Sequence, residues 1–268
     1  MDTLGVPLDA PLYGLDPDRG IEYWNCRAIG AAFLADRGVA DVLPGGLRLA
    51  DDPPVGMVLA ARYGGSTLGG YNELVSLVQV VDRNGDPSMY VPYIYVDNDA
   101  AMAAGREVLG APKKLAAIEL TGQHDIIQAT LERPAGKRLA TLTMRPSSRA
   151  EPGLIQSLLA PGTPLCSLRH LPAPPGGTRV HEIVKWSSEI IPHIDAGGEP
   201  IVFTGPASLT FDSPSAVDPV HRLGMGGMVA CVYAEFDMRL RAVGTVATAE
   251  RDSSDYRVPA FGRAGGAK

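Results

Sequence analysis

Two adjacent lysines, Lys113 and Lys114, follow a proline and lie among apolar residues. Apolar surroundings disfavour the charged ammonium, and a second cation beside it acts in the same direction. A lysine amine that is neutral near physiological pH attacks carbonyl carbons and forms an imine. The pair therefore predicts covalent chemistry, with Lys113 as the nucleophile. Because side chains alternate along a strand, Lys114 is expected on the opposite side, either tuning the nucleophile or forming a structural ion pair.

The residues on either side of the lysines predict a stiff corner. A helix is expected over residues 99–109, with Gly110 at its end and Pro112 unable to continue it. A strand is expected over residues 114–120. Lys113 should therefore enter the strand from a defined position, as a fixed nucleophile requires.

A carboxylate in a predicted β hairpin is the second candidate. Strands are expected over residues 71–81 and 88–96, with turn residues at 84–87 between them. Side-chain alternation puts Tyr71 and Glu73 on one face of the first strand, in a row that is otherwise mostly apolar. Glu73 could act there as a general acid or base, or it could face solvent.

Further β-favouring segments recur along the chain, separated by turn residues. This spacing predicts an α+β fold that is mainly antiparallel β, and it argues against alternating β-α units. The 268 residues show no internal repeat and no strong linker, so one domain is expected over residues 1–268. The other predicted strands span residues 22–26, 55–63, 125–132, 138–144, 178–191, 201–211 and 225–249.

Five segments are expected to lie outside the regular strands. Residues 1–22 are rich in Pro, Gly and Asp and predict an extended lead-in, and residues from about 250 to 268 predict a frayed tail. Helices are expected over 30–43 and 151–159. Residues 161–177 are expected to form a long irregular loop.

Composition excludes several classes of partner. The net charge of −6 and the lack of a basic run argue against nucleic acid. We find no apolar stretch of roughly 18 residues and no secretory signal, so no membrane partner and a cytoplasmic protein are expected. The cysteines Cys26, Cys166 and Cys231 are odd in number and far apart, which fits neither a disulfide framework nor a metal site.

Several runs of residues resemble the signature of the acetoacetate decarboxylase superfamily. The strongest match includes the lysine pair, and weaker matches follow in the same order as in the family. The runs are Glu22-Tyr23-Trp24-Asn25, Gly70-Tyr71-Asn72-Glu73, Tyr95-Val96-Asp97-Asn98-Asp99, Gly105-Arg106-Glu107, Pro112-Lys113-Lys114-Leu115 and Thr204-Gly205-Pro206-Ala207-Ser208-Leu209. The resemblance implies a closed conical β-barrel-like sheet with a few flanking helices and a homo-oligomer.

The resemblance also implies roles for individual residues. Acetoacetate decarboxylase is itself a known example of a lysine activated by an apolar pocket or a neighbouring cation. By this likeness Lys113 forms the imine without any other cofactor or metal, and Glu73 moves protons. Arg106 and Glu107 look like ion-pairing residues that position the lysine turn, and Lys114 supports the site.

Tyrosines of the hairpin form a further group. Aromatic side chains are common in strand cores, so Tyr71, Tyr93 and Tyr95 are expected mainly to pack the hairpin, with a place in the pocket as the alternative.

The chain departs from the family at the pocket. Ile21 aligns with a family arginine, and Arg19 is the nearest basic residue. Val58 aligns with a second family glutamate, and Ala111 replaces a bulky aromatic residue. A lost arginine weakens carboxylate recognition, and a smaller residue leaves room for a larger substrate.

These observations predict a lyase that forms a Schiff base with a small or medium oxo acid. The favoured reaction is aldol condensation and dehydration of a pyruvate-like 2-oxo acid with an aldehyde co-substrate, in secondary metabolism. One alternative is decarboxylation of acetoacetate or a larger 3-oxo acid. The other is a non-catalytic barrel that binds an apolar ligand.

Overall fold

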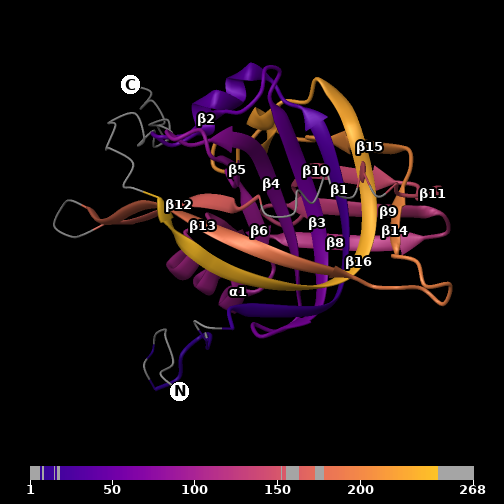
Figure 1. Cartoon of the computed structure of the whole chain (residues 1–268), viewed down its shortest axis with the longest axis horizontal. Coiled ribbons are helices and arrows are strands. Elements are labelled where there is room, and N and C mark those ends of the chain that lie inside the picture. The colour runs from indigo at the N-terminus through magenta and orange to yellow at the C-terminus, as the bar shows by residue number, and fades with distance from the viewer. Residues whose placement is uncertain are drawn as a thin grey trace, which may run out of the picture.

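Seven strands close into a barrel (Figure 1). The order around the ring is β1-β3-β4-β5-β12-β13-β16, and pairing of β16 with β1 closes it. Neighbours are antiparallel except β5 and β12, which run parallel. The strands are β1 (Ile21–Leu34), β3 (Val55–Ser66), β4 (Tyr71–Val81), β5 (Pro87–Tyr90), β12 (Leu165–Pro172), β13 (Thr178–Pro192) and β16 (Gly227–Val246).

The structure is a computed structural model. It describes residues 7, 9–14, 16, 19–151, 153–154, 163–172 and 178–246.

Shorter strands extend the barrel sheet, and a small sheet of order β15-β10-β9-β8 packs against its outside. The extending strands are β2 (Arg48–Leu49), β6 (Ile94–Val96), β7 (Lys113–Leu115), β11 (Ser148–Arg149) and β14 (Val202–Thr204). The small sheet contains β8 (Ala117–Gln123), β9 (Ile126–Glu132), β10 (Arg138–Met144) and β15 (Ala207–Thr210). The helical segments are η1 (Arg37–Val42), α1 (Asp99–Ala104), the π-helical turn η2 (Gly105–Leu109) and η3 (Val220–Leu223).

Two hydrophobic cores lie on opposite faces of the barrel strands. On β4, Leu74 and Val78 belong to the core between the barrel and the small sheet, whereas Tyr71 and Val75 belong to the core inside the barrel. Each fully buried Leu or Val stabilises the fold by about 1.5–3 kcal/mol relative to an exposed one. The strand register therefore decides which side chains reach the barrel interior.

The structure confirms the predicted fold class, because the chain is mainly antiparallel β and the sheet closes. The strands predicted over 71–81 and 138–144 match β4 and β10. The returning strand of the hairpin is divided into β5 and β6, and both pair with β4.

Two secondary-structure predictions were wrong. The helix over 30–43 is absent, because β1 continues through Leu34 and only the 3-10 turn η1 follows. Alanine-rich sequence favours helix, but here small residues fit a strand that is covered on both faces. The irregular loop over 161–177 contains β12.

Other predictions fall largely outside the described residues. Of the helix expected over 151–159, only Gly153 and Leu154 are described as helical, and the tail from about 250 to 268 is not described. Within the described part of the chain, no helix has the length and apolar character that a membrane span requires.

Candidate active site

The lysine corner is a capped helix that ends at a left-handed glycine. Asn98 caps α1 by accepting a hydrogen bond from the N–H of Ala101 at 2.8 Å. The helix continues as η2 and ends at Gly110, whose φ is 67°. Glycine adopts this backbone conformation without a steric penalty. The chain then turns into β7, whose first residue is Lys113.

Glycines also allow close packing at this corner. A Cβ atom at Gly105 would lie 2.5 Å from Cδ of Lys113, and one at Gly110 would lie 2.7 Å from Cα of Arg169. Both separations are far below van der Waals contact, so a larger residue would displace its neighbour. The alkyl chain of Lys113 is thus packed directly against η2.

Lys113 forms an ion pair with Glu73 inside the barrel. The Nζ of Lys113 lies 2.7 Å from Oε2 of Glu73, and the two residues are 4% and 7% exposed. The bridging strand β6 brings them together, because it pairs with β4 through Val96 and with β7 through Ile94. A buried ion pair requires costly desolvation, so it is a candidate for function rather than a source of stability.

Tyrosine rings surround this ion pair. The hydroxyl of Tyr63 donates to Oε1 of Glu73 at 3.0 Å, and that of Tyr71 donates to the hydroxyl of Tyr23 at 3.2 Å. The Nζ of Lys113 lies 5.5 Å from the centre of the Tyr71 ring, within cation–π range. Burial and the charge of Glu73 raise the pKa of Tyr63 well above 10.0. Tyr63 therefore remains a protonated donor to the carboxylate.

A cavity of about 160 Å³ inside the barrel borders this cluster. Its wall includes Lys113 and Glu73 but is otherwise mostly apolar, with Met57, Leu77 and Phe236 among its side chains. Among the described residues that line it, Lys113 is the only one with a positive charge. The arrangement offers an amine, an adjacent carboxylate and an apolar space for a ligand, which is what imine chemistry requires.

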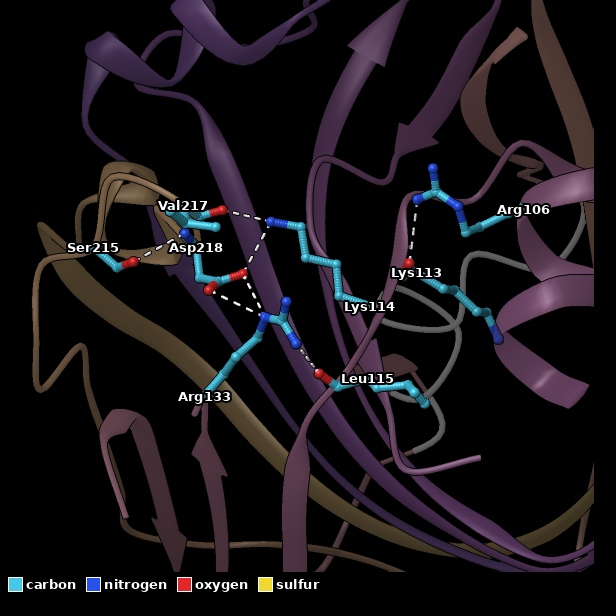
Figure 2. Close-up of polar contacts among 8 residues, drawn as sticks. All are labelled: Arg106, Lys113, Lys114, Leu115, Arg133, Ser215, Val217 and Asp218. Carbon is cyan, nitrogen blue, oxygen red and sulfur yellow. Dashed lines mark hydrogen bonds and ion pairs between the residues drawn. The ribbon is translucent and has the colours of Figure 1, made fainter. Parts of the chain in front are cut away.

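Lys114 lies on the other side of β7 (Figure 2). Its Nζ is 2.9 Å from Oδ1 of Asp218, and the Nε of Arg133 is 3.1 Å from the same oxygen. Lys114 also donates to the carbonyl of Val217. The two lysine side chains point in different directions in Figure 2, so the geometry matches a structural ion pair for Lys114 and does not match a second cation beside Lys113.

Among the described residues, Arg106 and Glu107 contact the corner through hydrogen bonds, and the ion pairs expected for them are not observed. Arg106 donates from Nη1 to the backbone carbonyl of Lys113 at 3.2 Å, as Figure 2 shows. Glu107 accepts a hydrogen bond from the hydroxyl of Tyr13 in the lead-in. Arg106 thus holds the lysine turn through its backbone, and Glu107 ties the lead-in to η2.

A buried hydrogen-bond chain fixes the end of η2 to the barrel. The Nε1 of Trp186, which lines the cavity, donates to Oγ of Ser167 at 3.2 Å. Ser167 donates to the carbonyl of Leu109 at 2.7 Å. The helix end therefore keeps a fixed distance from the cavity wall.

Several pocket candidates from the sequence lie elsewhere. Arg19 is an exposed residue beside Asp16, with a side chain 76% exposed, and it does not line the cavity. Ile21 and Ala111 are buried in the core inside the barrel without lining the cavity. Val58 points to the opposite core, against the small sheet, because alternation on β3 turns it away.

None of the three hairpin tyrosines, Tyr71, Tyr93 and Tyr95, lines the cavity. Tyr95 is 1% exposed in the core against the small sheet, and Tyr93 packs against the same core. Tyr71 is in the core inside the barrel, next to the amine of Lys113.

Tyr63 and Tyr23 were not assigned a role from the sequence, although both lie at the site. Tyr63 is the cross-strand neighbour of Tyr71, and it precedes the glycines of the β3–β4 turn. Two aromatic residues at matched distances from a Gly-rich turn are a usable signal for such a pair. Tyr23 lies on β1, and nothing local in the sequence relates it to the hairpin.

Within the described residues, no group of three or more His, Cys, Asp or Glu side chains is placed to hold a metal ion. Cys26, Cys166 and Cys231 are free and buried, and burial raises the pKa of each thiol to about 12. They pack as small apolar side chains.

Comparisons with known proteins identify the family of this chain. The family model of acetoacetate decarboxylase matches residues 7–249. The acetoacetate decarboxylase of Burkholderia multivorans is 30% identical over 239 residues, which are 89% of this chain and 92% of the relative.

Solved structures share the fold. Acetoacetate decarboxylase from Legionella pneumophila superposes with a TM-score of 0.77 at 24% identity, covering 91% of this chain and 94% of that one. The enduracididine biosynthesis enzyme MppR, complexed with the condensation product of pyruvate and imidazole 4-carboxaldehyde, has a TM-score of 0.71 at 17% identity, covering 91% and 95%. Because the family model covers most of the residues, this chain belongs to the acetoacetate decarboxylase family, a family of decarboxylating lyases.

Proposed function

We propose that this protein binds an oxo acid as an imine on Lys113 and releases CO₂ from it. The observation that carries the proposal is the 2.7 Å contact between Lys113 and Glu73 on the wall of an apolar cavity. A carboxylate at hydrogen-bonding distance can take the ammonium proton and leave a nucleophilic amine. Membership of the family supports the same assignment.

The proposed steps use only these two side chains and water. Glu73 takes a proton from Lys113, whose amine then attacks the ketone carbon. Glu73 returns this proton to the former ketone oxygen and then carries a second proton from the nitrogen to the same oxygen, which leaves as water, so that a protonated imine remains. The electron pair of the bond to the carboxylate moves into the imine and CO₂ departs. Glu73 relays a solvent proton to the enamine carbon, and water releases the ketone and restores the amine.

The charge distribution of the cavity favours decarboxylation. A substrate carboxylate finds no cation on the described wall except Lys113, which becomes the imine. A carboxylate in apolar surroundings is destabilised, and loss of neutral CO₂ removes the charge. A reaction that keeps the carboxylate to the end would benefit from an arginine, which the cavity wall does not offer among its described residues.

Aldol condensation and dehydration of pyruvate with an aldehyde is the second candidate. It is favoured by the structural likeness to MppR, whose complex holds a condensation product of pyruvate and an aldehyde. The same imine on Lys113 would lose an α-proton to Glu73, and the resulting enamine would attack the aldehyde before water is lost.

Two assays on the purified protein separate the candidates. Release of CO₂ from acetoacetate supports decarboxylation, and a new enone absorbance from pyruvate plus an aromatic aldehyde supports the aldol reaction. Lys113→Met is the control and should be inactive in both. If wild type gives neither product with either set of substrates, the proposal fails in favour of a non-catalytic binding barrel.

A further inference from the structure

We infer that a slot of small residues, which lies beside Glu73 on the inner face of the barrel, receives an apolar substituent of the substrate. The substrate class is then an oxo acid with a hydrocarbon or aromatic group beyond its ketone, larger than acetoacetate. This inference rests on the proposed function and concerns the same site. We name the slot by Ala28, Gly30 and Ala234.

The slot follows from the register of four strands. Glu73 on β4 lies opposite Ala61 on β3, Ala61 lies opposite Ala28 on β1, and Ala28 lies opposite Ala234 on β16. Side chains paired in this way point to the same face. The row that begins with the catalytic carboxylate is therefore continued by alanines, and Ala28 and Ala234 line the cavity.

The next row of the barrel extends the slot. It contains Gly30, whose neighbours are Leu59 on one side and Val232 on the other. A Cβ atom added at Gly30 would meet only Cδ1 of Leu59, at 3.0 Å, and no other atom within 4 Å. Glycine at this position is thus not required by a backbone turn. It keeps open space inside the barrel beside the alanine row.

Larger side chains limit the slot one row further on. Met57 on β3 pairs with Leu77 on β4, and both line the cavity. The space therefore begins at Glu73, widens at the alanines and Gly30, and meets bulky residues at Met57. This shape fits a chain of limited length rather than an open channel.

The chemistry of the slot selects its occupant. The three slot residues and the larger residues beyond them (Leu59, Val232, Met57 and Leu77) are apolar, and none of these side chains offers a charge or a hydrogen bond to a ligand. A polar substituent would lose its hydration there without compensation. Each methylene that enters such a site is expected to improve binding roughly fourfold.

The test compares acetoacetate, 3-oxohexanoate and 3-oxooctanoate as substrates of wild type, with CO₂ release and borohydride trapping as readouts. We expect kcat/KM to rise from the first to the second and to level off or fall once the slot is full. Ala234→Leu should lower the ratio of 3-oxohexanoate to acetoacetate turnover by at least about tenfold, because its side chain occupies the slot. Ala242→Leu, an exposed position on the same strand that does not line the cavity, is the matched control and should keep the wild-type ratio.

A second variant protects the test against misfolding of Ala234→Leu. Val232→Ala enlarges the slot and should move the preference toward 3-oxooctanoate. The inference is overturned if wild type prefers acetoacetate, or if both variants keep the wild-type ratio while adducts still form.

Failure of the proposed function would look different. Calorimetric titration of 2-pentanone and 2-heptanone into Lys113→Met measures binding without imine formation. Chain-length-dependent binding in that variant, with no adduct in wild type, would retain the slot and reject the imine.

Discussion

Lys113 and Lys114 are neighbours in the chain but lie in two different electrostatic environments. Inside the barrel, Lys113 contacts Glu73 at 2.7 Å with both side chains less than 10% exposed. Outside, Lys114 contacts Asp218 at 2.9 Å with its own side chain 35% exposed. The N–O distances are nearly equal, so proximity to a carboxylate does not distinguish a nucleophile from a structural lysine.

The difference lies in what surrounds each pair. Asp218 forms ion pairs with both Lys114 and Arg133, so its negative charge is more than compensated. Asp218 does not line the cavity of the barrel. Glu73 has Lys113 and the neutral phenol of Tyr63 as its partners, and the cavity lies beside them. Proton transfer between amine and carboxylate is therefore useful only on the inner side.

The largest expected effect comes from Lys113→Met. Activity should fall by more than the roughly 10²–10⁴-fold that an acid–base group contributes, because the covalent intermediate is lost. Steady-state kinetics of CO₂ release measure the loss. The variant also leaves Glu73 buried without its cation, which costs about 3–5 kcal/mol. The double variant Lys113→Met/Glu73→Gln is the folding control. If it is folded and active, the role of Lys113 is wrong.

Glu73→Gln should have the next largest effect. Loss of the proton relay is expected to lower kcat by about 10²–10⁴-fold. The adduct should still form slowly, because Lys113 remains. Single-turnover kinetics and trapping rates separate the two quantities, and a wild-type kcat would show that Glu73 only pairs with the amine.

Tyr63→Phe should have an intermediate effect on catalysis at the site inside the barrel. Removing a hydrogen bond to a carboxylate costs about 1.5–3 kcal/mol, so kcat/KM should fall roughly tenfold or more, with a shifted pH profile. Tyr71→Phe is the matched control, since its hydroxyl donates to Tyr23 and not to Glu73. Equal effects of the two variants would argue against a specific role for Tyr63.

The inner tyrosines also predict the stability at alkaline pH. Burial raises the pKa values of Tyr63 and Tyr71 in the folded protein, whereas the unfolded chain ionises its tyrosines near pH 10. Above that pH the unfolded state binds fewer protons, so the free energy of unfolding should fall by up to about 1.4 kcal/mol per pH unit for each tyrosine. Urea unfolding at several pH values measures this slope, and Tyr71→Phe should reduce it. A slope that is the same in wild type and variant contradicts the assignment.

The smallest effect is expected on the outer side. Lys114→Met should leave kcat and the adduct within about twofold of wild type, because Asp218 keeps Arg133 as a partner. Stability should fall by about 0–1 kcal/mol, in a salt-dependent manner. Thermal unfolding at low and high salt measures it. A large loss of kcat with unchanged stability would mean that Lys114 acts on the nucleophile.

The sequence was sufficient to predict the corner that holds Lys113 at the start of a strand. Gly110 and Pro112 determine where the helix ends, and strict alternation on β4 puts Glu73 in an inward row. Both inferences depend on local geometry. The lysine pair was harder to assign, because the partner of Lys114, Asp218, is 104 residues away in the chain.

Errors arose where register decides the outcome. Alignment with a family glutamate selected Val58 as a pocket position, but the cross-strand partner of Glu73 is Ala61, and the side chain of Val58 points to the opposite face of the strand. The role of Tyr63 depends on the same register. The helix expected over 30–43 failed because closure of the barrel requires small residues in β1, a requirement that comes from β3 and β16 on either side.

Borohydride reduction of wild type in the presence of acetoacetate, followed by peptide mass spectrometry, tests the central claim most directly. The account predicts a reduced adduct on Lys113 and none on Lys114. The Lys114→Met variant should be labelled like wild type, and Lys113→Met should not be labelled. An adduct on Lys114, or equal labelling of Lys113→Met, would contradict the assignment of the nucleophile to the inner side of β7.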